Sequence, residues 1–68
     1  MRYAVVIEKA EGNYSAYVPD LPGCVATGAN VGAVEAAIRR ALRFHVDGLK
    51  ADGLPVPQPR SIAASVEA

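Results

Sequence analysis

Alternating apolar and polar positions near the start of the chain predict a β-hairpin. Residues 3–9 (YAVVIEK) and 14–18 (YSAYV) are rich in the β-branched and aromatic types that favour strands. Between them, residues 10–13 (AEGN) supply the glycine and asparagine that tight turns favour. Because side chains alternate between the two faces of a strand, we expect Val5 and Ile7 to share the core face.

A loop and a short third strand follow the hairpin. Residues 19–23 (PDLPG) interrupt any ladder, because proline lacks an amide donor and glycine permits a sharp reversal. Residues 24–27 (CVAT) predict a third strand, which Gly28 ends. Three consecutive strands with short connections indicate an antiparallel meander.

A helical periodicity begins after Asn30, a residue type whose side chain caps helices well. We expect a helix from residue 31 to about residue 52, closed by Gly53. At about 100° per residue, its apolar side chains fall within an arc of about 160°. These are Val34, Ala37, Ile38, Ala41, Leu42, Phe44, His45, Gly48 and Leu49. The arc predicts a helix lying across one face of the sheet, with Val34, Ile38, Leu42 and Leu49 in the core.

The rest of the chain completes the predicted fold. Residues 54–59 (LPVPQP) predict an extended connector, and residues 60–66 (RSIAASV) a last strand returning to the sheet. The expected class is α+β: an antiparallel sheet of three to four strands with one long amphipathic helix on one face, in the order β-β-β-α-β. Residues 1–68 form one domain, because a chain of 68 residues leaves no room for a second.

Composition and charge exclude several classes of function. Seven Lys and Arg balance seven Asp and Glu, which argues against nucleic-acid binding through bulk charge. No apolar run approaches the about 18–20 residues that cross a bilayer, and the start of the chain lacks a secretion signal. The lone Cys24 cannot form an intramolecular disulfide. We therefore expect a cytoplasmic protein that, being small, self-associates.

Candidate catalytic and metal-binding side chains are few. Cys24 and His45 could in principle form a thiolate–imidazolium pair. A free cysteine is more often a small buried hydrophobe, and His45 lies near the centre of the apolar arc, where a structural role is the commoner one. One histidine and one cysteine do not supply the three or four ligands of a metal site. We expect no catalysis, no metal and no cofactor.

Two surface features remain open. Arg39, Arg40 and Arg43 cluster on the solvent side of the helix and could meet a phosphate or an acidic partner, although Glu35 and Asp47 balance them. The last predicted strand would be a sheet edge suited to strand addition by a second chain.

The run YSAYVPDLPGCVATG, residues 14–28, resembles the HicB family of antitoxins and HicB-like (UPF0150-type) small proteins. The family pattern continues in YAVVIE (3–8), EAAIRRALRFHVDGL (35–49) and DGLPVPQP (52–59), so the resemblance covers nearly the whole chain. It implies a partial ribonuclease H-like fold and homodimers or homotetramers. It also implies binding to a HicA-like toxin, a small protein that resembles double-stranded RNA-binding domains and cleaves messenger RNA.

The implied role is that of an antitoxin in a type II toxin–antitoxin system, which neutralises the toxin by occluding it. Because loops on a rigid sheet are common recognition sites, we expect the partner to contact Pro19, Asp20, Leu21, Pro22 and Gly23. Asp20 would then face a cationic surface, and Asp20→Lys would weaken binding without lowering the melting temperature. The alternative is a solitary oligomeric module with a regulatory or scaffold role and no toxin.

Many HicB antitoxins carry a C-terminal helix-turn-helix or ribbon-helix-helix module that binds their own promoter. This chain ends at Ala68, soon after the proline-rich connector. We therefore expect no C-terminal DNA-binding module, and whether the chain contacts an operator stays open.

Overall fold

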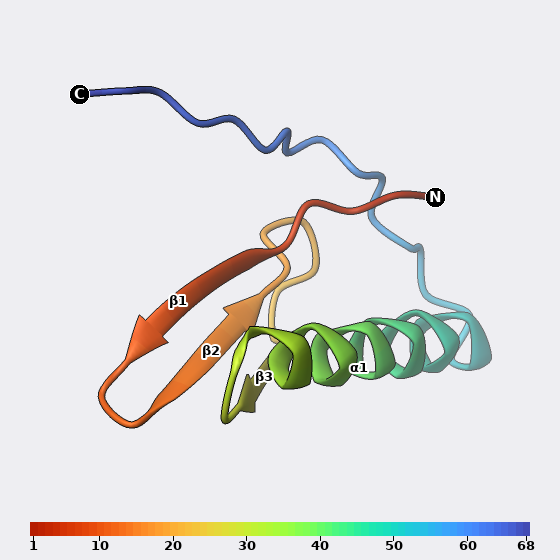
Figure 1. The fold of residues 1–68 in the computed structure, drawn as a ribbon. Coiled ribbons are helices and arrows are strands. Elements are labelled where there is room, and N and C mark those ends of the chain that lie inside the picture. The colour runs from red at the N-terminus through yellow and green to blue at the C-terminus, as the bar shows by residue number, and fades with distance from the viewer.

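The computed structural model describes residues 1–68 and shows a three-stranded antiparallel sheet with one long helix across one face (Figure 1). The strands are β1 (Val6–Ala10), β2 (Asn13–Tyr17) and β3 (Val25–Gly28), in the sheet order β1-β2-β3. The helix, α1 (Val31–Ala51), follows β3 directly. The α+β class and the meander predicted from the sequence are confirmed.

The hairpin of β1 and β2 turns at residues 11–12, where Gly12 adopts a φ of 81°. The ladder runs from the pair Ala10–Asn13 to the pair Val6–Tyr17 and stops there, so β1 begins three residues later than predicted. The reason lies in the opposite strand, because the next pair would involve Val18. The amide and the carbonyl of Val18 are both bonded inside the following loop.

Both ends of α1 are capped as the sequence predicts. The Asn30 side chain accepts a hydrogen bond of 2.8 Å from the Ala33 amide, satisfying one of the free donors of the first turn. At the other end, Gly53 has a φ of 69° and its amide donates to the Lys50 carbonyl, while Leu54 donates to Leu49. This is the Schellman pattern, which turns the chain sharply away from the helix axis.

The core lies between α1 and the inner face of the sheet. Six of the 68 residues are fully buried: Ala16, Val18, Leu21, Cys24, Val34 and Ile38. Of the remaining side chains predicted for the core, Val5, Ile7 and Leu42 pack against this cluster in half-buried positions. Six buried residues make a small core, so the free energy of unfolding depends strongly on each of them.

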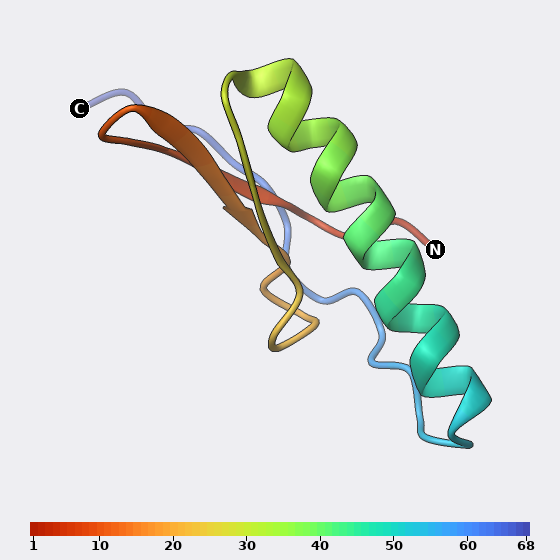
Figure 2. The same ribbon diagram turned by 90° about the horizontal axis from the view of Figure 1, so that it is seen from below.

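Three helix positions depart from the predicted apolar arc, and one of them is Gly48, which is exposed. Leu49 lies outside the core cluster, and Phe44 is 83% exposed, so placing Phe44 against the sheet was wrong. A helix of 21 residues is about 31 Å long, whereas a strand of five residues spans about 17 Å. The second half of α1 therefore runs past the strands (Figure 2), and Phe44, at one edge of the arc, meets solvent.

The predicted fourth strand at residues 60–66 does not form, and the chain beyond residue 53 has no regular secondary structure. A ladder would need the backbone amides of Arg60 and Ser61. Both amides donate instead to the Asp20 carboxylate, at 2.9 Å each. The observed element order is therefore β-β-β-α.

The end of β3 touches the first turn of α1 so closely that only glycine fits. A Cβ at Gly28 would lie 2.6 Å from the Val34 amide nitrogen and 2.9 Å from the Ala33 carbonyl carbon. We expect Gly28→Ala to lower the free energy of unfolding by about 1–3 kcal/mol, because the backbones would have to move apart. Chemical denaturation followed by circular dichroism measures this change.

Gly48→Ala is the matched control on the exposed side of α1. A Cβ there would meet no atom within 4 Å, and alanine favours helix more than glycine does. We expect it to raise the free energy of unfolding by about 0.5–1 kcal/mol. Equal effects of the two substitutions would show that β3 and α1 are not in contact at Gly28.

Candidate partner-binding site

The loop between β2 and β3, residues 19–23, is closed by hydrogen bonds within its own backbone. Val18 accepts from the Leu21 amide at 3.0 Å, and Leu21 accepts from the Cys24 amide at 3.0 Å. A third bond of 3.1 Å joins the Val18 amide to the Cys24 carbonyl and closes the base of the loop. Gly23 provides the reversal with a φ of 85°, a conformation that costs glycine little. The loop therefore has a single defined backbone path.

Leu21 points inward from this loop. Its side chain is 0% exposed and belongs to the core cluster with Val18 and Cys24. Pro19, Pro22 and Gly23 are exposed. Of the five predicted contact residues, Leu21 is therefore a core residue. It anchors the loop to the core and is not available for contact with a partner.

Asp20 is engaged within the chain. Its Oδ2 accepts the Arg60 and Ser61 amides at 2.9 Å each, and its Oδ1 accepts the Ser61 hydroxyl at 3.1 Å. The C-terminal segment, 40 residues away in sequence, is thereby fastened to the loop. Asp20→Lys would break these three bonds. We therefore expect the substitution to release the C-terminal segment as well as to affect partner binding.

These bonds lower the pKa of the Asp20 carboxyl. The backbone amide of Ser61, followed by that of Arg60, holds the pKa of the Asp20 carboxyl below its ordinary value of 3.8. A carboxyl with a depressed folded-state pKa stabilises the fold fully above its unfolded pKa, and the contribution is lost as pH falls through the folded pKa. We expect a carboxyl ¹³C titration to place Asp20 below an aspartate in an unfolded peptide of the same local sequence. Coincident titrations would contradict the three bonds.

Cys24 and His45 offer little to catalysis in this arrangement. Burial raises the pKa of the Cys24 thiol, which disfavours the nucleophilic thiolate. His45 lies half-buried on α1 and makes no side-chain hydrogen bond to Cys24. The His, Cys, Asp and Glu side chains form no group of three or more that could hold a metal ion.

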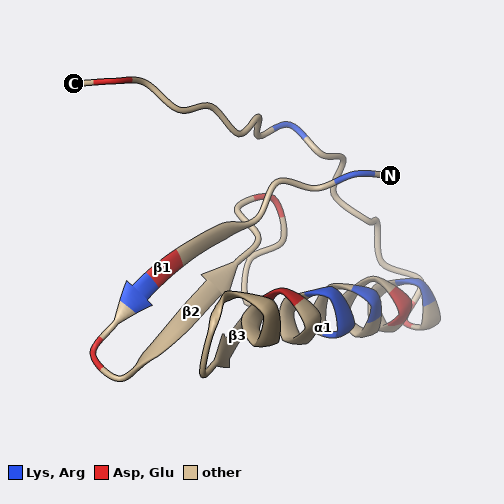
Figure 3. Cartoon of the chain, in the orientation of Figure 1, with Lys and Arg blue, Asp and Glu red and all other residues tan.

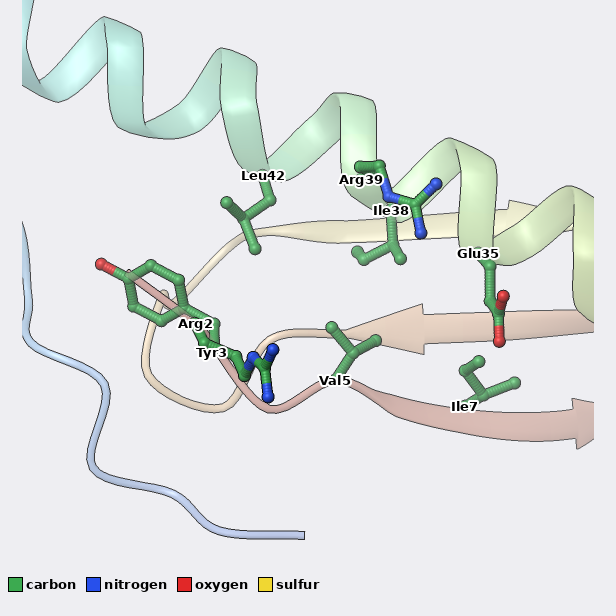
Figure 4. A pocket seen from close by; sticks show the side chains of 8 residues that line it. All are labelled: Arg2, Tyr3, Val5, Ile7, Glu35, Ile38, Arg39 and Leu42. Atoms are coloured by element: carbon green, nitrogen blue, oxygen red, sulfur yellow. The ribbon is translucent and has the colours of Figure 1, made fainter.

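A groove of about 540 Å³ separates the start of the chain from α1 (Figure 4). It exists because α1 packs mainly on β3 and β2 and leaves the β1 side uncovered. Tyr3, Val5 and Ile7 face the helix side chains across it, and charged groups line the rim. Its lining residues are Arg2, Tyr3, Val5, Ile7, Glu35, Ile38, Arg39 and Leu42. The volume of the groove is in the range of ligand pockets. Its lining contains no histidine, no cysteine and no pair of carboxylates for acid–base chemistry.

Charged residues of both signs lie along α1, where Glu35 and Asp47 accompany the arginines, and on the hairpin (Figure 3). The arginines Arg39, Arg40 and Arg43 are exposed on α1 and flank the exposed Phe44. Acidic side chains occupy the hairpin and the β2–β3 loop, at Glu8, Glu11 and Asp20. Helix α1 does not have the long apolar stretch that a membrane-crossing helix requires.

Comparison with known sequences gives consistent matches over almost the whole chain. Residues 3–68 match the family model of HicB-like antitoxins of bacterial toxin–antitoxin systems. A UPF0150 protein of Thermoplasma acidophilum is 33% identical over all of both chains. A UPF0150 protein of Helicobacter pylori is 36% identical over 91% of this chain and 88% of its own length.

An uncharacterized 14.9 kDa protein of Haemophilus phage HP1 is also similar, at 32% identity over 91% of this chain. The chain spans 47% of the length of that phage protein. Among solved structures, one chain of a HicA3 and HicB3 toxin–antitoxin complex has the same fold, with a TM-score of 0.75 and 27% sequence identity. The match covers 87% of this chain and 70% of that one.

Proposed function

The chain belongs to the family of HicB-like antitoxins, and from this membership we propose that it binds and neutralises a HicA-like toxin that cleaves messenger RNA. The observation that carries the proposal is the likeness to a chain of a HicA3 and HicB3 complex at a TM-score of 0.75. The antitoxin role makes the chain a regulatory protein rather than an enzyme. Action on messenger RNA places the pair in the cytoplasm.

The β2–β3 loop is the element that we propose at the centre of the toxin interface. Its backbone is fixed by three hydrogen bonds and its base is anchored by the buried Leu21. A loop that is already ordered loses little conformational entropy on binding. Pro19, Pro22 and Gly23 present a rigid, exposed surface that suits recognition.

Occlusion requires more surface than this loop provides. A stable protein interface buries about 800 Å² on each partner, contributed by about 20–30 residues. The chain exposes 5173 Å² in total, so such an interface would cover a substantial part of it. The toxin would therefore contact the segments beside the loop as well. Neutralisation by protein contact needs no catalytic group in the antitoxin.

The proposal is tested by co-expressing the chain with the adjacent short open reading frame. We expect the two products to co-purify, and the chain to rescue cells from the growth arrest that the toxin causes alone. The control is the toxin expressed with Gly28→Ala, whose weakened fold should reduce rescue. If the chain purifies alone as a homo-oligomer and rescues nothing, it acts as a solitary module and the proposal fails.

A further inference from the structure

A short segment after the helix, residues 57–61, crosses the molecule as a strap that is fastened at both ends. At one end the Tyr3 hydroxyl donates to the Pro57 carbonyl at 2.6 Å. At the other end Asp20 accepts the Arg60 amide, the Ser61 amide and the Ser61 hydroxyl, at 2.9, 2.9 and 3.1 Å. Two segments that are far from the strap in sequence therefore fix its path.

The Asp20 carboxylate accounts for most of the polar bonding of the strap. Two of its five residues are prolines, which have no backbone N–H. Of the three remaining backbone donors, Asp20 accepts two, those of Arg60 and Ser61. The prolines also restrict the backbone to extended conformations, so few anchor points are enough to order it. After Ser61 every residue is exposed, and none makes a side-chain hydrogen bond to the rest of the chain.

We propose that Asp20 is a latch residue that holds the strap beside the β2–β3 loop, so that the loop and the strap form one composite docking surface for the toxin. The docking half of this proposal rests on the proposed function, whereas the latch does not. Asp20 acts here as a positioning residue, because its carboxylate is occupied by the strap. Arg60, whose backbone amide Asp20 holds, has an exposed side chain.

This arrangement changes the expected chemistry of the interface. The predicted contact between a free Asp20 carboxylate and a toxin cation would require the strap to leave its anchor. With the latch closed, the surface instead offers rigid prolines from two segments and one guanidinium group. A partner complementary to it would present apolar or aromatic groups and an acidic side chain opposite Arg60, since guanidinium groups pair well with carboxylates.

The latch can be tested on the isolated chain, because the Arg60–Ser61 peptide bond is a trypsin site held by Asp20. Proteases cut segments that open locally, so we expect Asp20→Ala to release the peptide 61–68 about tenfold faster, as followed by mass spectrometry. Ser61→Ala removes one of the three bonds and should give a smaller increase. Glu11→Ala, in the exposed hairpin turn, is the matched carboxylate control and should leave the rate unchanged. An unchanged rate for Asp20→Ala would overturn the latch.

The docking half is tested with a catalytically silenced toxin from the adjacent open reading frame. We expect Asp20→Ala and Arg60→Glu each to weaken its binding about tenfold or more, while Glu11→Ala leaves it unchanged. Faster tryptic cleavage with unchanged toxin affinity would overturn the composite surface and leave the proposed function standing. No toxin binding by the unmodified chain would overturn the proposed function and the docking half together, while the latch would still be judged by the proteolysis.

Discussion

Ile38→Asp is expected to abolish the cooperative thermal unfolding transition of this chain. Ile38 is 3% exposed and lies in the first half of α1 against the sheet. An aspartate there would bury a charge with no partner, at a cost of several kcal/mol. A core in a chain of this size rarely supplies more than about 3–5 kcal/mol. The substitution therefore removes the whole stability reserve, and a circular dichroism melt should show no transition.

Two further aspartate substitutions on the same helix make this prediction specific. Phe44→Asp places the same group at a side chain that is 83% exposed, so the transition should remain. Leu42→Asp, which the apolar arc alone would predict to unfold the chain, should have an intermediate effect, because Leu42 is half-buried at the groove. A cooperative melt for Ile38→Asp would show that the helix face is not buried as described.

The elements of this fold were predictable because their signals are local. The hairpin turn, the Asn30 cap and the Gly53 stop each depend on residues within a few positions of one another. The helix boundaries from sequence agree with the structure to within one residue. What local signals could not supply is the length of sheet beneath the helix, which decides that Phe44 is exposed and that Leu49 lies outside the core.

The prediction of a fourth strand was wrong for a reason that the local sequence pattern does not show. Residues 60–66 have an acceptable strand composition, but two of their amides are taken by Asp20, 40 residues earlier in the chain. A side-chain acceptor that competes with a ladder at this separation is visible only once the chain is folded. The same fact explains why Asp20 looked like a free surface charge in the sequence.

The sequence predicted which segment forms the candidate site, but not which of its side chains are buried and which are exposed. The loop was recognised from its prolines and glycine, and its five residues were treated alike. A single leucine in a loop otherwise made of proline, aspartate and glycine was the signal that one loop side chain turns inward. The structure shows that this residue anchors the loop to the core, with two well-buried neighbours in Val18 and Cys24.

Leu21→Ala is the second substitution with a large expected effect, because it tests the link between the core and the loop. Removing a fully buried leucine side chain costs about 2–5 kcal/mol, which is comparable to the whole stability reserve. We expect a strongly lowered melting temperature and, at growth temperature, loss of toxin capture in the co-expression assay. Denaturation of the purified variant, with and without the toxin, measures both effects.

Pro22→Ala, one position further along the same loop, separates stability from recognition. Pro22 is exposed, so its replacement should change the free energy of unfolding by no more than about 1 kcal/mol, the typical effect of losing a proline's restraint on the unfolded chain. If the loop contacts the toxin, Pro22→Ala weakens capture while the fold persists, whereas Leu21→Ala reduces both together. Full stability of Leu21→Ala would contradict the anchor. Undiminished capture by Pro22→Ala would move the centre of the interface away from this side chain, to other parts of the composite surface.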